Sequence, residues 1–197
     1  MLFRSLIARE AGVDLKVSGT GDVAALARWG IDGGDLPAGM LALEGRVSGP
    51  MADPQSDVRV TSPRVAWQGA AITDLVARAH VSSAAARIDE LAFGIEGGRV
   101  TGMGTVPFDN TDARVEASWT GIDGARLVRM IAPAATLVPA ATISGQLAAS
   151  GPAANVNAWS ADIRAHLAPA GNARNRLAAA GDAHLVLTQG KIGRAHV

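Results

Sequence analysis

Apolar and polar residues alternate along most of this chain. In the segment 56–61, Val58 and Val60 are separated by charged or polar neighbours. The segments 65–67, 114–119 and 162–167 follow the same period of two. This period is typical of β-strands that bury one face and expose the other. The pattern therefore predicts a mainly β chain of half-buried antiparallel strands.

Turn-forming residues separate these predicted strands. Clusters of Gly, Pro, Asn, Asp and Ser favour turns because they tolerate or fix the unusual backbone angles that turns need. Short strands with regular turns between them indicate an all-β architecture. The predicted turns are GTGD (19–22), IDGGDLPAG (31–39), SGPMADP (48–54), EGG (96–98), PFDNTD (107–112) and SGPAAN (150–155).

Two stretches have helical spacing instead. Asp22 is placed to cap a short helix in the segment 23–29. Asp123 is placed to cap a second helix, whose apolar stripe includes Leu127 and Ile131 and which Pro133 ends. Each helix has only two to three turns, so we expect each to dock on the sheet.

The two predicted helices belong to an internal repeat. Each precedes a strand with a glycine, Gly45 or Gly145, and then a Gly-Pro turn, in LEGRVSGP and ISGQLAASGP. The repeat divides the chain into a lead-in (1–12), a first β-block (13–112), a second, truncated β-block (113–190) and a tail (191–197). The tail ends in IGRAHV, which matches the translation of a common sequencing adapter, so we expect it to be foreign to the fold.

Composition narrows the possible functions. Lys plus Arg and Asp plus Glu both number 18, so the formal net charge is zero, which argues against a nucleic-acid partner. There is no cysteine, which excludes disulfides and thiolate metal sites. Aromatic residues make up only 4% of the chain, against 48% hydrophobic residues in total. This balance suits narrow layered packing better than a large aromatic core.

Catalytic and cofactor motifs are missing from the sequence. Neither a phosphate-binding glycine motif nor a nucleophile elbow is present, and the histidines do not have metal-ligand spacing. Helix capping explains the matched Asp22 and Asp123 more simply than a pair of catalytic acids. We therefore expect a protein that is not an enzyme and has no cofactor or metal.

The predicted sheet must hide its apolar face, and two short helices cannot cover it. In one arrangement the sheet curls around a groove, and its apolar residues line a site suited to acyl chains. In the alternative, the sheet closes into a sandwich and the same apolar residues fill its core. The candidate groove-lining residues are Val58, Val60, Val65, Trp67, Val100, Val115, Trp119, Ile143, Leu147, Ile163 and Leu167.

The order of these motifs resembles the repeats of the AsmA/TamB-like superfamily of Gram-negative bacteria. The resemblance covers about residues 13–167 and rests on Leu43–Pro54, Val65–Leu75, Ile88–Val106, Ala117–Leu127 and Ile143–Pro152. It implies an elongated antiparallel β-sheet curled into a trough, with one or two short docked helices. It also implies a fragment of a long periplasmic protein. The family's N-terminal membrane helix and C-terminal module are missing here, so membrane anchoring and partner docking cannot be carried over from the family.

The expected function follows from this resemblance. The apolar groove is expected to shield or conduct phospholipid or other acyl chains between the inner and outer membranes, or to support outer-membrane protein assembly. The partners would be a lipid and possible outer-membrane assembly proteins, with a parent protein anchored in the inner membrane. The alternative is a structural or adhesive β-repeat stalk of a secreted or surface protein, for example a parallel β-helix.

Overall fold

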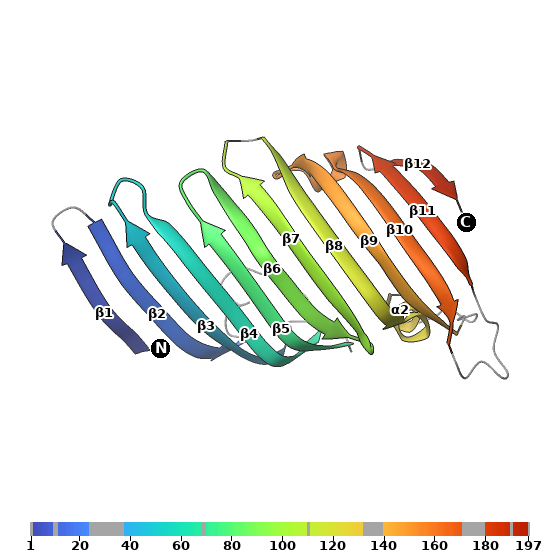
Figure 1. The fold of residues 1–197 in the computed structure, drawn as a ribbon, viewed down its shortest axis with the longest axis horizontal. Coiled ribbons are helices and arrows are strands. Elements are labelled where there is room, and N and C mark those ends of the chain that lie inside the picture. The colour runs from blue at the N-terminus through green and yellow to red at the C-terminus, as the bar shows by residue number, and fades with distance from the viewer. Residues whose placement is uncertain are drawn as a thin grey trace.

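The fold is a single antiparallel β-sheet in which the strands follow one another in chain order (Figure 1). The computed structural model describes residues 2–9, 12–23, 38–67, 70–109, 111–131, 140–170, 180–189 and 191–196. Within them, twelve strands form the sheet. The strands are β1 (Leu2–Arg9), β2 (Gly12–Asp22), β3 (Ala38–Gly49), β4 (Gln55–Trp67), β5 (Ala70–Val81), β6 (Ala85–Ile95), β7 (Gly98–Pro107), β8 (Asp112–Asp123), β9 (Ala141–Pro152), β10 (Ser160–Pro169), β11 (Gly181–Thr188) and β12 (Lys191–His196).

Two short helical elements accompany the sheet. Helix α2 (Gly124–Ile131) follows β8, and a 3-10 turn, η1 (Val156–Ala158), lies between β9 and β10. The Asp123 carboxylate accepts a hydrogen bond from the backbone N–H of Arg126 at 3.1 Å, so the predicted cap is confirmed. The predicted helix after Asp22 lies outside the described residues, apart from its first residue, Val23.

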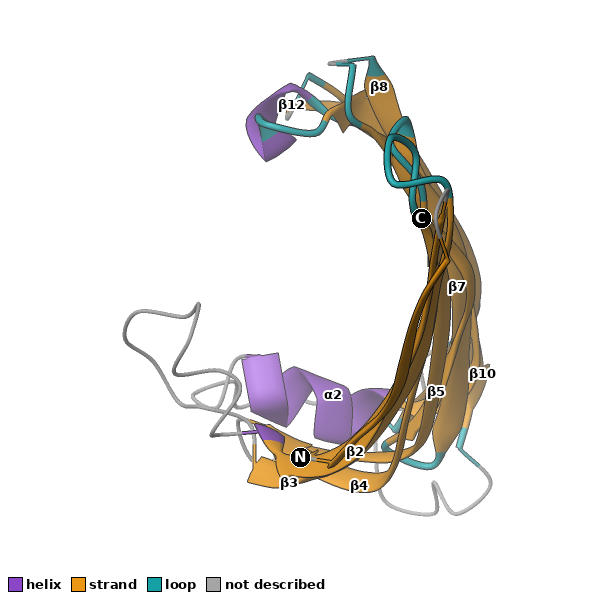
Figure 2. Cartoon of the chain, turned by 90° about the vertical axis from the view of Figure 1, so that its left-hand side faces the viewer, coloured by secondary structure: helices purple, strands orange, loops and turns teal. Residues whose placement is uncertain are grey.

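The sheet is an open arc when viewed along its length (Figure 2). Helix α2 lies on the concave side of the arc. A Cβ atom at Gly124 would lie 3.0 Å from Cδ1 of Ile143, so α2 begins directly against the side chain of Ile143 on β9. The face that carries Ile143 is therefore the concave face.

The two Gly-Pro turns have the same geometry. Strand β3 ends at Gly49 and strand β9 ends at Pro152. The backbone N–H of the residue three positions on from each proline donates to the proline carbonyl, at 3.0 Å for Pro50 and 3.1 Å for Pro152. The repeat motif therefore marks two equivalent strand ends, as its spacing predicted.

The structure corrects two sequence predictions. GTGD (19–22) is not a turn, because these residues continue strand β2 and pair with β3 in unbroken register. Glycine is only weakly unfavourable inside a strand, and the pairing with β3 outweighs its turn preference. The parallel β-helix alternative is also wrong, because every strand pairing in the described part of the chain is antiparallel.

The predicted block boundaries leave no break in the sheet. Strand β7 pairs with β8 across the boundary at 112/113, and β12 in the predicted foreign tail pairs with β11. The coarse fold prediction, a mainly β antiparallel sheet with a short docked helix, is confirmed. The sheet is not closed, so the sandwich alternative is wrong.

Candidate functional site

The concave face of the sheet is apolar across strands β2–β11. Residues that pair directly across neighbouring strands point to the same face. Starting from Val17, the pairings run through Gly45, Val58 and Ala79 to Ile88. The same row continues through Gly104, Val115, Ala149, Ala161 and Leu187. We call this side of β2–β11 the apolar face. None of its described side chains is charged.

The register places ten of the eleven predicted lining positions on the apolar face. The side chain of Trp67 lies outside the described part, although its backbone pairs with Ala70 at the end of β4. The remaining ten side chains come from β4, β7, β8, β9 and β10 and lie on one continuous surface: Val58, Val60, Val65, Val100, Val115, Trp119, Ile143, Leu147, Ile163 and Leu167.

A β-bulge in β4 keeps the valines on both sides of it on the apolar face. Strict alternation would place Val60 and Val65 on opposite faces, because they are five positions apart. The pairing of β4 with β3 shifts by one residue between these positions, which returns Val65 to the apolar face. The Ser62 hydroxyl is buried at this bulge and donates a hydrogen bond to the Met40 carbonyl at 2.6 Å. Strand β8 also has a bulge, at Gly121, where φ is +67°.

The apolar face is only partly covered. No large side chain in the described part is fully buried, and most of the face is half-buried. The exceptions include Val65 and Ile122, each 6% exposed; Ile122 is the second-last residue of β8, close to the start of α2. A closed core would bury its Val, Leu and Ile side chains almost completely. The face is therefore an open apolar surface.

Two tryptophans lie across glycines on this surface. A Cβ atom at Gly145 would lie 2.6 Å from Cζ2 of Trp119, so the indole covers that glycine. Trp159 covers Gly151 in the same way and donates its ring N–H to the Pro152 carbonyl at 2.9 Å. By contrast, a Cβ at Gly45 would have only ordinary contacts. Close packing therefore requires a glycine at position 145 but not at position 45.

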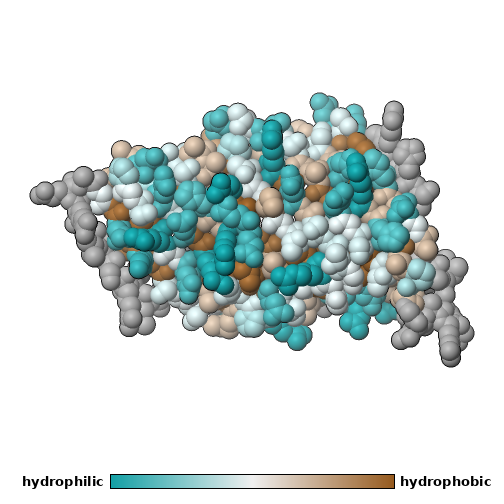
Figure 3. All heavy atoms as spheres, viewed as in Figure 1, coloured by the Kyte–Doolittle hydropathy of each residue, from teal (hydrophilic) through white to brown (hydrophobic). Residues whose placement is uncertain are grey.

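The convex face carries the charged residues (Figure 3). Oppositely charged side chains face each other across neighbouring strands, for example Arg46 and Asp14 at 2.8 Å and Arg78 and Glu90 at 3.2 Å. The hydrogen bond to Asp14 raises the pKa of Arg46. A hydrogen bond from the His184 ring is the main cause that lowers the pKa of Asp162.

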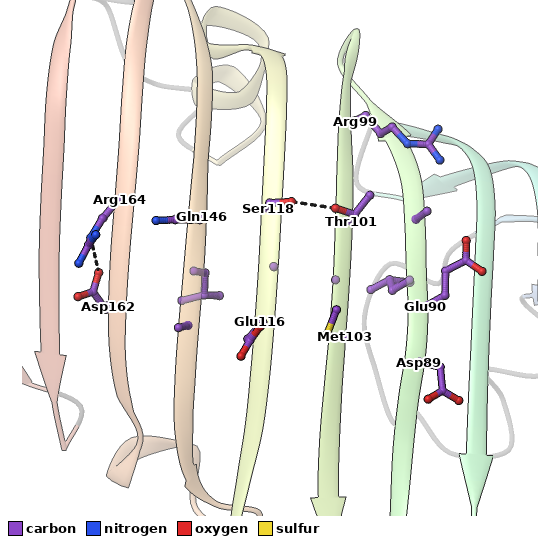
Figure 4. A pocket seen from close by; sticks show the side chains of 16 residues that line it. Asp89, Glu90, Arg99, Thr101, Met103, Glu116, Ser118, Gln146, Asp162 and Arg164 are labelled. Atoms are coloured by element: carbon purple, nitrogen blue, oxygen red, sulfur yellow. Dashed lines mark hydrogen bonds and ion pairs between the residues drawn. The ribbon is translucent and has the colours of Figure 1, made fainter.

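A shallow hollow of about 630 Å³ lies on the convex face between β6 and β10 (Figure 4). Thr101 and Ser118 point toward one another at its centre, with their hydroxyl oxygens 2.8 Å apart. Arg164 and Asp162 form an ion pair at 3.2 Å at one side. These groups satisfy one another, and the hollow shows no nucleophile beside a base.

One row on the convex face has the composition of a catalytic triad without its geometry. The register aligns Ser144, His166 and Asp182 across β9, β10 and β11, and His166 Nδ1 lies 2.7 Å from Asp182 Oδ1. The Ser144 hydroxyl, however, accepts a hydrogen bond from the Gly121 N–H at 3.0 Å, and none of the described contacts joins it to His166. The imidazole is also 62% exposed. This row is not preorganised for nucleophilic catalysis.

A further hollow, of about 400 Å³, lies at the edge of the sheet beside the β6–β7 turn and α2. We call this edge the α2 lip. The sequence analysis missed its charged residues, because three separate segments of the chain supply them. Only the EGG turn signal pointed to this place. The charged residues are Asp74, Glu96, Arg99 and Arg126.

Other kinds of site find no support in the described residues. No group of three or more His, Asp or Glu side chains there could hold a metal ion. None of the described helices is long and apolar enough to cross a membrane. In comparisons with protein-family models, curated proteins and solved structures, this chain matches none of them.

Proposed function

We propose that this chain is a non-enzymatic segment of a cell-envelope protein and that its apolar face binds lipid acyl chains. In this proposal the arched sheet is a trough that shields lipid on its way between the inner and outer membranes, or that supports outer-membrane protein assembly. The segment would act in the periplasm, within a parent protein anchored in the inner membrane. The sequence resemblance to the AsmA/TamB-like superfamily supports this location.

The size of the apolar face is the observation that carries the proposal. The strands β2–β11 span about 48 Å at about 4.8 Å per strand, and each contributes about four or five inward positions. The resulting surface is on the order of 1,000 Å², well above the few hundred Å² of apolar patch that a soluble monomer usually exposes. Its lack of charged side chains suits an acyl chain better than a polar ligand.

The test compares one substitution on each face of strand β8. Val115→Glu places a carboxylate on the apolar face, whereas Ser118→Glu adds the same charge on the exposed convex face. We expect Val115→Glu to weaken binding of a fluorescent fatty-acid analogue by about tenfold or more, because an acyl chain cannot satisfy the charge. Ser118→Glu should leave binding within about twofold.

Circular dichroism should show the same β-rich spectrum for both variants. Equal binding by the two variants, or no binding by the unmodified chain, would contradict the proposal. If the unmodified chain does not bind the fatty-acid analogue, a structural or adhesive stalk becomes the better explanation of the repeat.

A further inference from the structure

The turns between the strands lie along two opposite edges of the sheet, because the strands run alternately up and down (Figure 1). One edge includes the α2 lip. The other edge holds the turns β3–β4, β5–β6, β7–β8 and β9–β10, and we call it the tip rim. Within the described part of the chain, the tip rim consists of residues 50–54, 82–84, 108–109, 111 and 153–159.

The tip rim carries little charge. Asp53 and Asp109 are the only charged residues among those just given, and none of them is Lys or Arg. The Asp109 carboxylate already accepts hydrogen bonds from the backbone N–H and the hydroxyl of Thr111, at 3.1 and 2.7 Å. The hollow of the α2 lip, by contrast, is lined by four charged residues. The tip rim is therefore the less polar of the two edges.

Two large apolar residues are exposed at the tip rim. Met51, in the β3–β4 turn, is 76% exposed, and Phe108, at the start of the β7–β8 turn, is 53% exposed. Their turns are four strand spacings apart, which separates them by about 19 Å. The Phe108 N–H donates to the Ala84 carbonyl at 2.8 Å, which holds the β7–β8 turn against the β5–β6 turn. The edge thus presents two separate apolar contact points.

The apolar face extends up to the tip rim. Val81, Ala86 and Val106 pair with one another across β5, β6 and β7, on the apolar face. Val81 directly precedes the β5–β6 turn, and only Pro107 separates Val106 from Phe108. No charged residue lies between the apolar face and the tip rim on these strands.

From the contrast between the two edges we infer that the tip rim docks on the surface of a lipid bilayer, with Met51 and Phe108 inserted among the head groups. This inference rests on the proposed function, because a lipid that dissolves poorly in water has to enter the trough from a membrane. The tip rim is the edge at which the apolar face meets large exposed apolar side chains. The bilayer that fits is zwitterionic, because the tip rim has no Lys or Arg to attract anionic lipids.

The experiment measures co-sedimentation of the full chain with phosphatidylcholine vesicles. We expect Met51→Ser/Phe108→Ser to weaken vesicle binding about tenfold, because two large apolar side chains no longer leave water. Met40→Ser/Met103→Ser is the matched control, since Met40 and Met103 are 54% and 56% exposed but lie off the tip rim. This control should stay within about twofold of the unmodified chain. Replacing part of the phosphatidylcholine by phosphatidylglycerol should not tighten binding.

Three results would overturn the inference alone. The first is an equal loss of vesicle binding in the two double variants, and the second is tighter binding to the vesicles with phosphatidylglycerol. The third is a change from dimer to monomer in Met51→Ser/Phe108→Ser without loss of vesicle binding, which would assign the tip rim to a second copy of the chain.

The fluorescent fatty-acid analogue, added without vesicles, tests the apolar face separately. Met51→Ser/Phe108→Ser should bind the analogue as tightly as the unmodified chain does, because the tip rim lies outside the trough. If the unmodified chain binds the analogue but does not sediment with vesicles, the inference is wrong and the proposed function stands. If the unmodified chain binds neither, both are wrong.

Discussion

The two faces of the sheet are built from the same strands and differ in almost every chemical property. On β8, Val115, Ala117 and Trp119 lie on the concave face, while the residues between them lie on the convex face and are exposed. The convex face carries ion pairs between neighbouring strands, for example Arg46 with Asp14 and Arg78 with Glu90. Among the described elements, only the short helix α2 and the η1 corner pack on the concave face. The comparison shows that the half-buried apolar face is the unsatisfied surface of this molecule, and the predictions below test each side of it.

The largest expected effect is on the apolar face at Gly145. A valine there would place its Cβ against the Arg164 carbonyl and 2.6 Å from the Trp119 ring, so either the strand or the indole must move. We expect Gly145→Val to lower the free energy of unfolding by about 3 kcal/mol. Gly21→Ala is the control on the same face, because nothing lies within 4 Å of its added Cβ. Chemical denaturation of both variants measures the difference, and a Gly145→Val variant as stable as Gly21→Ala would show that Trp119 does not lie across this glycine.

A smaller effect is expected at the bulge that keeps β4 on the apolar face. Ser62→Ala leaves the Met40 carbonyl without its hydrogen bond at a site where Ser62 is only 3% exposed. The free energy of unfolding should fall by about 1–2 kcal/mol. Ser56→Ala, on the same face of the same strand, has no such bond among the described contacts and should change stability by less than about 0.5 kcal/mol. Equal losses in the two variants would mean that the hydroxyl does not stabilise the bulge.

The smallest effect is expected on the convex face at Asp162. Hydrogen bonds from His184 and Arg164 hold the pKa of this carboxyl below its ordinary value of 3.8. Because the pKa is lower in the folded chain than in the unfolded chain, the stabilisation is fully present above about pH 4 and is lost as the pH falls through the folded-state value. Melting temperatures of the parent chain and of Asp162→Asn should differ slightly at pH 6 and converge at low pH. If the difference between the two melting temperatures grew as the pH fell, the pKa of Asp162 would not be lowered by folding.

Alternation along the chain predicted the strands and their apolar positions, because every second side chain of a strand lies on the concave face. It could not locate the bulges. Pro63 is the only sign of a bulge between Ser62 and Val65. The extra residue of this bulge nevertheless decides on which face Val65 lies. The predicted Gly-Pro corners came from local turn preferences and were confirmed. The turn predicted at 19–22 was wrong because pairing with β3 outweighs the local preference of two glycines.

The charged hollow at the α2 lip could not be predicted from the sequence, for a different reason. Asp74, Glu96 and Arg126 belong to β5, the β6–β7 turn and α2, which only the folded sheet brings together. No motif with a fixed spacing links them. The Asp123 cap was predicted because the cap and its helix are adjacent in the chain, so local chemistry determines it.

The order of the strands has a consequence for how such a molecule can vary. Each strand pairs with the strands immediately before and after it in the chain, so no hairpin is threaded between distant segments. Inserting or deleting one hairpin would lengthen or shorten the apolar face by about 10 Å while leaving every other pairing in place. Length is therefore an independent variable in this architecture, because the number of hairpins can change without redesign of the chemistry of either face.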